Sequence, residues 1–497
     1  MTPPAGLAGQ LSRGLAWACI ALAPLPFGSV QPVWVFALCG GLAASLVLAD
    51  LSRLDGAAAR QLAPVWLAAA AVVALACLQG LPPGILLPAS PVWEQAGTVL
   101  GRPLDPAVAV TRDPPWRALG TTLIVALAFT RVYLLALDRD EADRLHRLVA
   151  LAGLAYAAIG IANVLVAPDM LLWRARRAYF DMLTGTFVNR NTAATYFGTC
   201  SLVALVLLLR FVRRHLGSGR PLRRMAGDLV GRAPPRPVLI WGGVWLALLG
   251  ATVATTSRAG ASLTLACTVL TVLLWSPRQL GRTAIVLVAA LGVATVAFEL
   301  LGGGLAGRVA SRGVGDASRT GFYVDALAMI ADAPWTGVGL GAFEAAFPPY
   351  RSTPGVGIVD KAHSTPLEFA VEIGVPATAL LIAASLTVLV RLFRACLAER
   401  RFRMYPLAGL CTALLGGGHS LVDFSLQIPG YMIVYATVLG ACSAQALPTR
   451  AKRDLRRRSG HSDRAAARTP RPDGGETPVP VQGHARSTED PTGPSAR

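Results

Sequence analysis

Charged residues are scarce in this chain, making up only 15% of its 497 residues. Hydrophobic residues make up 54%, and they gather in runs that recur along almost the whole length. A run of roughly 20 apolar residues can cross the hydrocarbon core of a membrane as a helix. The scarcity of charge therefore excludes an ordinary soluble domain, and the runs predict a protein that crosses a membrane many times.

Two further patterns are missing. The apolar runs are rich in Leu, Ala and Val and lack the strict polar–apolar alternation that is typical of transmembrane β-barrel strands, so helices are favoured. The eight cysteines lie in apolar runs or at their edges, and none forms a Cys-x-x-Cys motif. This spacing indicates neither a zinc site nor a disulfide framework, and we expect no metal and no cofactor.

Acidic residues are outnumbered by basic ones, 28 to 46, which gives a net charge of +18. Eight arginines lie from Arg210 to Arg236, and eleven Lys and Arg residues follow Pro448. Such clusters are typical of cytoplasmic loops of membrane proteins, whereas a nucleic-acid-binding face interleaves basic and aromatic residues. We therefore predict a cytoplasmic loop and tail, and no nucleic-acid partner.

The fold class that follows is an all-α, polytopic membrane helix bundle of about twelve spans with both chain ends in the cytoplasm. Arg13 alone precedes the first apolar run, which we expect to be retained as a span; the first two spans could instead form a re-entrant pair. The predicted spans are 14–30, 32–50, 64–82, 116–137, 148–167, 191–212, 238–256, 261–275, 283–301, 366–394, 406–423 and 427–446.

The chain is thus divided into a transmembrane domain, residues 1–447, and a tail, residues 448–497. The tail is rich in Pro, Gly, Ser and charge, so we expect it to be disordered and basic. Three loops, 83–115, 168–190 and 302–365, are predicted on the outer side. The last is too long for a plain connector.

Within the long loop, Ser318 can cap a helix from about Arg319 to Asp332, which Pro334 ends. The stretch Gly337–Gly341 resembles a dinucleotide fingerprint only superficially, because no strand precedes it. A re-entrant or interfacial turn is therefore favoured over a nucleotide site.

A marked helix start follows this loop. Thr365, Pro366 and Glu368 have the spacing of a capping box with proline at the first helical position. His363 lies two residues earlier, where the positive end of the helix dipole favours a neutral imidazole that can accept a proton. The simpler alternative is a loop histidine bonded to the backbone, and Glu368 is expected to be structural.

Ionisable residues at the edges of predicted spans mark a candidate site. Arg258 occupies a tight turn between two spans, where it can bind an anion or extend to lipid headgroups. Arg319 stands in the first turn of its helix, where its charge opposes the helix dipole. His419 and Asp423 are four residues apart and are predicted to share one helix face, with a hydrogen bond between helices as the simpler interpretation.

For two other charged segments, interpretations without a catalytic role are favoured. Arg174, Arg176 and Arg177, with neighbouring aromatic residues, are predicted to anchor an interfacial helix. Asp138–Arg139–Asp140 has the Asp-x-Asp pattern of many metal-dependent sugar transferases. Because further arginines follow it, a solvated charged loop is favoured there.

Several segments between about residues 180 and 430 share order and spacing with one family. They are Gly185–Asn191, Thr256–Gly260, Ser318–Thr320, Ala333–Gly339, Ala362–Ser364 and His419–Phe424 with Pro429. In these residues the chain resembles the O-antigen ligase and polymerase superfamily of bacterial inner-membrane glycosyltransferases.

The resemblance implies transfer of a glycan from a polyprenyl diphosphate carrier to a hydroxyl of lipid A–core or of another glycan, on the periplasmic face of the bacterial inner membrane. It implies that Arg258 and Arg319 bind the diphosphate and that His363 deprotonates the acceptor. The other candidate residues are Arg190, for the diphosphate, and Asn189, Asn191, His419 and Asp423, as supporting groups.

Transfer from a diphosphate carrier requires neither a general acid nor a metal. Diphosphate is a good leaving group, so no general acid is required, and guanidinium groups can neutralise its growing charge without a metal. One base on the opposite side of the anomeric carbon supports displacement with inversion. Repeat-unit polymerase, lipid A–core ligase and protein-glycosylating ligase share these residues and remain open.

Two other classes of membrane protein share features with this sequence. A transporter or flippase of lipid-linked saccharides should show paired inverted repeats with helices broken at the membrane midplane. A peptidoglycan glycosyltransferase of the shape, elongation and division type has a similar span pattern, but its motifs are not found. The polar residues gather at one predicted face, which favours the enzyme.

Overall fold

The computed structural model describes residues 6–111, 113, 115–216, 235–275, 317–352, 357–398 and 404–446. In these residues the chain is mostly helical, and its strands are the short pair β1 (Met170–Leu171) and β2 (Arg174–Ala175), which form an antiparallel hairpin. The all-α class is therefore confirmed for the described part of the chain.

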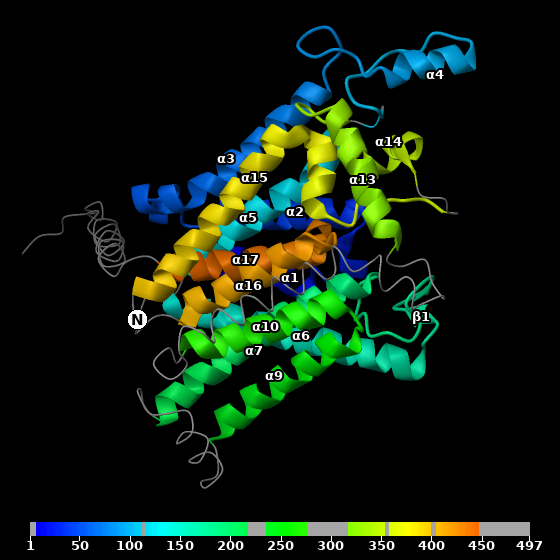
Figure 1. Cartoon of the computed structure of the whole chain (residues 1–497). Coiled ribbons are helices and arrows are strands. Elements are labelled where there is room, and N and C mark those ends of the chain that lie inside the picture. The colour runs from blue at the N-terminus through cyan, green and yellow to red at the C-terminus, as the bar shows by residue number, and fades with distance from the viewer. Residues whose placement is uncertain are drawn as a thin grey trace, which may run out of the picture.

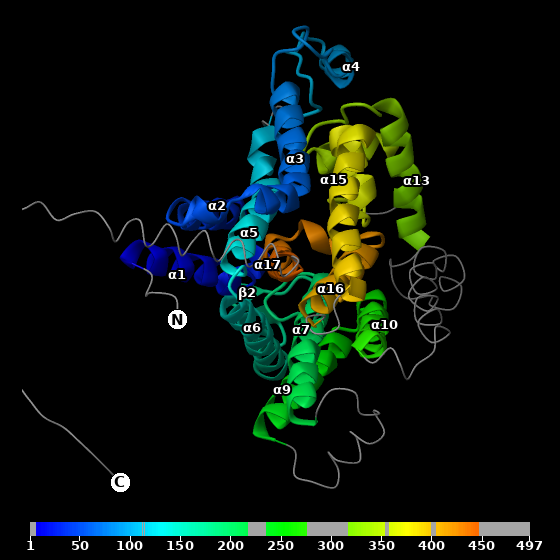
Figure 2. The same cartoon turned by 90° about the vertical axis from the view of Figure 1, so that its left-hand side faces the viewer.

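The helices pack side by side as a bundle (Figures 1 and 2). Their bounds are α1 Leu7–Leu22, α2 Pro32–Val47, α3 Gly56–Gln79, α4 Val92–Leu100, α5 Leu119–Leu135, α6 Arg139–Val166, α7 Arg190–Leu216, α9 Arg236–Ala254, α10 Arg258–Trp275, α13 Ala317–Asp332, α14 Phe343–Ala346, α15 Thr365–Ala398, α16 Met404–Ser420 and α17 Pro429–Gln445. Short 3₁₀ helices span Phe27–Ser29, Leu51–Arg53, Pro115–Ala118, Pro348–Tyr350 and Ser425–Gln427.

Seven helical segments of the described residues are long and apolar enough to cross a membrane: α3, α5 with the 3₁₀ turn before it, α6, α7, α9, α10 and α15. Helices α1, α2, α16 and α17 coincide with other predicted spans but have only 16 or 17 residues. The predicted span 283–301 and the tail 448–497 lie outside the described residues. The structure supports a multi-pass membrane protein, and the count of about twelve spans stays a prediction.

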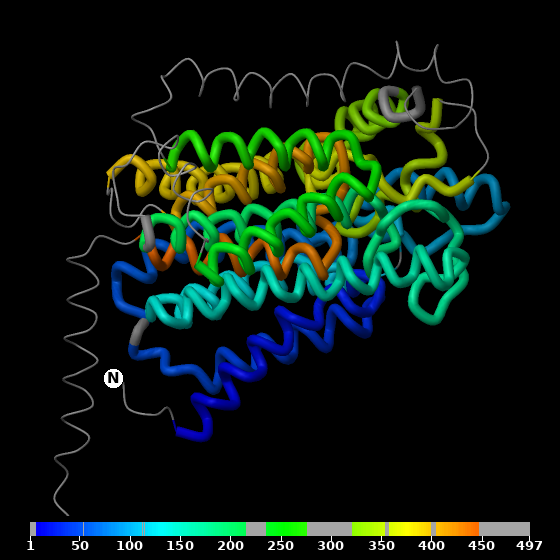
Figure 3. Tube along the Cα trace, turned by 90° about the horizontal axis from the view of Figure 1, so that it is seen from below, coloured from blue at the N-terminus to red at the C-terminus, as the bar shows by residue number. Residues whose placement is uncertain are grey.

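Helix direction alternates so that several distant connections meet at one end of the bundle, on the right in Figure 1. Helices α7 and α10 begin at this end and α16 finishes there, and Figure 3 shows the loop before α7 at the same end as α13 and α4. We call it the polar end; its described segments are 168–191, 255–258, 317–352, 357–365 and 421–428. The segments that carry the candidate polar residues, which were predicted on one side of the membrane, therefore lie at one end of the bundle.

The centre of the bundle is formed by α7 and α17, which are buried on almost every side. Glycine allows α17 to approach α5 closely: a Cβ on Gly440 would lie 2.7 Å from the carbonyl oxygen of Phe129. Small residues are the usual means of such close helix packing in membranes, where association depends on van der Waals contact. This approach packs α17 directly against α5 at the centre of the bundle.

Helix α15 is broken near its start. Gly374 has φ 73° and ψ 168°, a conformation that essentially only glycine adopts, and Pro376 follows it. The N–H of Val375 donates to the carbonyl of Pro334 at 2.8 Å, so the turn after α13 occupies the break. The continuous span predicted from Pro366 is therefore two helical pieces, of which the first belongs to the polar end.

The glycine-rich stretch after α13 completes this contact. Val338 N–H donates to the carbonyl of Val371 at 2.8 Å, and Gly339 N–H donates to that of Glu372 at 3.1 Å. The buried amide of Gln79, at the end of α3, donates to the Glu372 carbonyl at 3.0 Å and accepts from Leu340 N–H at 3.0 Å. The glycines of this stretch therefore serve close backbone packing against α15.

Replacing Gly374 with alanine is expected to lower the free energy of unfolding by roughly 3 kcal/mol, because a strained backbone and a collision add together. The new Cβ would lie 2.4 Å from the carbonyl oxygen of Trp335. Thermal unfolding in detergent measures the loss. Gly84→Ala is the matched control: Gly84 has φ +89° but open space around it, so about 1 kcal/mol is expected. Equal losses would contradict the role assigned to the collision.

Candidate functional site

The start of α7 is shaped by three consecutive polar residues. Asn189 accepts a hydrogen bond from Asn191 N–H at 2.6 Å through its side-chain oxygen, which is the geometry of a helix N-cap. The Arg190 guanidinium donates to the Thr256 hydroxyl at 3.0 Å and lies 5.6 Å from the centre of the Tyr179 ring. Asn189 is thus a capping residue, and Arg190 is directed toward the turn that carries Arg258.

That turn joins α9 to α10. Thr256 has φ 57°, which is rare for a β-branched residue and marks local strain. Ser257 is buried, and its hydroxyl accepts from Gly260 N–H at 3.4 Å, so it caps α10. Arg258 is the first residue of α10, and its side chain is exposed at the polar end. An arginine at a helix start beside Arg190 makes this surface favourable for an anionic group.

Asp423 is almost fully buried and connects three elements. Its carboxylate accepts from the Asn191 amide at 2.6 Å and from the Ser425 hydroxyl at 3.1 Å, while its carbonyl accepts from Thr365 at 3.1 Å. Because α7, the segment after α16 and the start of α15 all depend on it, Asp423 acts as a structural junction.

His419 meets the same junction indirectly. Its Nδ1 lies 3.3 Å from the Ser425 hydroxyl, which also contacts Asp423. Helix α16 ends at Ser420, so the prediction that His419 and Asp423 share one helix face is wrong. Ser425, in the 3₁₀ turn that follows, contacts both His419 and Asp423 and so connects them.

His363 lies next to this junction. Its backbone has φ 55°, and its imidazole is stacked on Phe322, with 6.3 Å between ring centres, and tilted against Phe424, with 5.3 Å between centres. The Tyr323 hydroxyl donates to the His363 carbonyl at 3.2 Å. The side chain is partly exposed. The imidazole therefore has a defined orientation in a residue that is partly exposed at the polar end.

The capping box predicted for α15 is wrong. The Thr365 hydroxyl donates to the Asp423 carbonyl, and the Glu368 carboxylate accepts from Lys361 Nζ at 2.8 Å and from Ala362 N–H at 2.9 Å. A buried carboxylate gains more from an ammonium group than from a neutral cap, which explains the outcome. Glu368 is buried and holds Lys361 and Ala362 instead of capping α15, and Lys361 is a residue that the sequence analysis missed.

Arg319 lies in the first turn of α13, and its side chain is outside the described part of the structure. The helix predicted from about Arg319 to Asp332 is confirmed, although Ser318 lies within its first turn rather than before it. Helix α13 supplies Phe322 and Tyr323 to the surroundings of His363. The site residues thus form two groups: Arg190 with the Arg258 turn, and His363 with Asp423, Asn191 and His419.

The loop before α7 differs from its prediction. Instead of an interfacial helix, it contains the hairpin β1–β2. Arg176 is buried and donates to the carbonyls of Met170 at 2.9 Å and of Tyr179 at 2.7 Å, so it organises the loop rather than anchoring it to lipid. Burial lowers the pKa of Arg176.

Asp138 caps α6: its carboxylate accepts from the N–H groups of Asp140 at 2.8 Å and of Glu141 at 3.4 Å. The Asp-x-Asp pattern is therefore a helix start. The prediction of a solvated charged loop is therefore wrong at this position.

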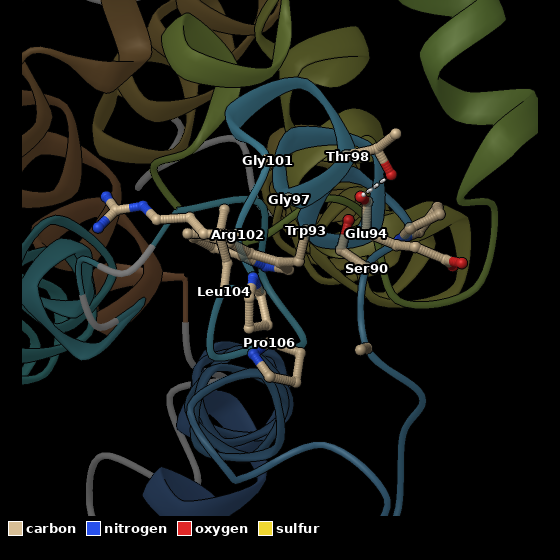
Figure 4. A pocket seen from close by; sticks show the side chains of 12 residues that line it. Ser90, Trp93, Glu94, Gly97, Thr98, Gly101, Arg102, Leu104 and Pro106 are labelled. Atoms are coloured by element: carbon tan, nitrogen blue, oxygen red, sulfur yellow. Dashed lines mark hydrogen bonds between the residues drawn. The ribbon is translucent and has the colours of Figure 1, made fainter.

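A surface pocket of about 630 Å³ lies around α4, in the predicted loop 83–115 (Figure 4). Its lining comes from residues 89–106, and Trp93 is fixed there by donating to the Ala109 carbonyl at 3.0 Å. None of the candidate site residues lines it.

Residues 242–382 match the family model described as O-antigen ligase. Over these residues the resemblance to the O-antigen ligase and polymerase superfamily is confirmed. The matched residues include Arg258, Arg319 and His363, while Arg190 and Asp423 lie outside them. No curated protein matches the chain. The matched O-antigen ligase family implies a membrane enzyme that transfers glycosyl groups and acts, in general, with lipid-linked glycan and lipid A–core partners.

Proposed function

We propose that this O-antigen ligase-type chain transfers a glycan from a polyprenyl diphosphate carrier to a hydroxyl acceptor at the polar end. The acceptor is lipid A–core or the end of another glycan chain. The reaction is metal-independent and inverts the anomeric centre.

The observation that carries this proposal is the position of two neighbouring residues at the start of α7. Arg190 reaches the turn before Arg258, and Asn191 reaches Asp423, beside which His363 lies. One helix start therefore brings an arginine group suited to diphosphate and a histidine suited to proton transfer to the same end of the bundle. An enzyme that displaces a diphosphate needs these two groups near each other.

Each group has a defined part in the reaction. The His363 imidazole accepts the proton of the acceptor hydroxyl while the hydroxyl oxygen forms a bond to the anomeric carbon. The bond from that carbon to the diphosphate oxygen breaks on the opposite side, and the electron pair leaves with the diphosphate. Arg258, Arg319 and Arg190 stabilise the growing negative charge through paired N–H donors. Asn189, Asn191, His419 and Asp423 hold these groups in place.

The polar end faces the periplasm in this proposal, and the membrane is the bacterial inner membrane. Arg210, Arg213 and Arg214 lie at the opposite end of α7, and the basic residues after them continue the cluster. Positively charged segments stay in the cytoplasm during membrane insertion. The start of α7, which carries Arg190, then lies on the periplasmic side.

Deleting the gene and separating surface polysaccharide on a gel tests the proposal. Loss of long chains on lipid A–core, with carrier-linked chains retained, is the result expected for a ligase. Products with a single repeat unit are expected for a polymerase. Unchanged surface polysaccharide in the deletion strain would contradict both, and carrier-linked chains confined to the cytoplasmic leaflet would indicate a flippase.

A further inference from the structure

The backbone of His363 is strained and needs support from its surroundings. A non-glycine residue at φ 55° is disfavoured by roughly 1–3 kcal/mol and persists only where neighbouring contacts determine it. Asn and Gly would adopt this conformation more easily. The residues that impose it on a histidine are therefore part of the site.

The support on the N-terminal side comes from one buried carboxylate. Glu368 is 1% exposed; it accepts from Lys361 Nζ at 2.8 Å and from Ala362 N–H at 2.9 Å. Lys361 also donates to the Gln427 side-chain oxygen at 3.0 Å. The two residues directly before His363 are thereby fixed to α15 and to the segment after α16. We call Lys361, Glu368 and Gln427 the lysine clamp.

The support on the C-terminal side comes from the same segment. Thr365, two residues after His363, donates to the Asp423 carbonyl at 3.1 Å, and Phe424 contacts the imidazole. Residues 423–427 therefore contact the chain before, at and after His363. Loss of the clamp would release one side of this arrangement and leave the other side in place.

The charges of the clamp depend on each other. Burial on its own would lower the pKa of Lys361, but the nearby carboxylates of Glu368 and Glu372 raise it, so the ammonium form is kept. A buried carboxylate without its cation is strongly unfavourable. Replacing Lys361 by an uncharged residue should therefore displace the Glu368 carboxylate, and with it the backbone of Ala362.

We propose that Lys361, Glu368 and Gln427 are positioning residues that hold the His363 imidazole at the acceptor hydroxyl. This inference rests on the proposed function, because it assumes that His363 accepts the proton. The clamp lies on the histidine side of the site, away from the Arg258 turn. It should therefore govern the chemical step and leave binding of the diphosphate donor largely unchanged.

The test uses the full chain in lipid nanodiscs, with the polyprenyl diphosphate-linked glycan and the acceptor isolated from the cells that make this protein. Lys361→Met is expected to lower kcat about 10- to 100-fold, since misplacing a catalytic group by about 1 Å has effects of this size. The KM for the donor should change less than threefold. Lys361→Arg, which keeps a cation able to bridge Glu368 and Gln427, should restore most of kcat.

Two further variants keep the result interpretable. Gln427→Leu leaves the Lys361–Glu368 ion pair in place and should lower kcat by a smaller factor, about three- to tenfold, even if Lys361→Met does not fold. Arg117→Met is the matched control: it breaks an exposed ion pair with Asp113, with 2.6 Å between nitrogen and oxygen, and should leave kcat unchanged.

Wild-type kcat in both Lys361→Met and Gln427→Leu would overturn the inference. So would a parallel loss of kcat, donor affinity and thermal stability that Lys361→Arg does not restore, because that pattern indicates a purely structural role. Failure of the wild-type protein to transfer glycan in this assay is a different result, which counts against the proposed function itself.

Discussion

Replacing His363 with alanine is expected to lower the rate of glycan transfer by about 10²- to 10⁴-fold, the usual contribution of a positioned general base. The imidazole is held between Phe322 and Phe424 and is partly exposed, so it can meet an acceptor hydroxyl. The neighbouring Asp423 carboxylate cannot take its place, because it is buried and bonded to Asn191 and Ser425. Donor hydrolysis or transfer by purified variant protein measures the loss.

His363→Asn separates the loss of the base from the loss of the fold. Asparagine tolerates the left-handed backbone better than most residues, so this variant should unfold at a temperature near that of the wild type while remaining as inactive as the alanine variant. Added imidazole should restore part of the activity of His363→Ala by occupying the vacated space. An alanine variant that complements the deletion strain fully would exclude His363 as the base.

Much of the helical framework could be predicted because its signals are local. Apolar runs long enough to span a membrane, and turn residues between them, identify most helices to within a few residues. The break at Gly374 could not be predicted in this way. The hydrophobic run continues through it, and the positive φ arises from a tertiary contact with Pro334 and Trp335, forty residues earlier.

The site could be predicted in its residues but not in its connections. Arg258 and His363 stand out in the sequence because charge at the edge of a span is unfavourable without a function. The partners of Glu368 depend on how the loop folds back, so a local capping box was expected where Lys361 and Ala362 bind instead. Arg176 was misjudged for the same reason, since its backbone partners become neighbours only after the hairpin forms.

Replacing Arg258 with alanine is expected to lower kcat/KM by about 10²- to 10³-fold, equivalent to roughly 3–4 kcal/mol of transition-state stabilisation. Arg258 begins α10 on an exposed surface, next to the strained Thr256 to which Arg190 donates. A strained turn that presents arginine at a helix start is suited to an anion. The diphosphate gains charge as the anomeric bond breaks, so the loss should appear in kcat as well as in KM.

Lysine at the same position distinguishes charge from geometry. Arg258→Lys keeps the positive charge but not the paired donors, so its kcat/KM should lie between those of alanine and wild type. Arg174→Ala is the matched control, because Arg174 is also exposed at the polar end but stacks on Phe27, with 4.9 Å from guanidinium to ring centre. Its kcat/KM should stay within threefold of wild type. Equal losses in Arg174→Ala and Arg258→Ala would mean that the basic surface attracts the donor in general, and the specific diphosphate contact assigned to Arg258 would have to be abandoned.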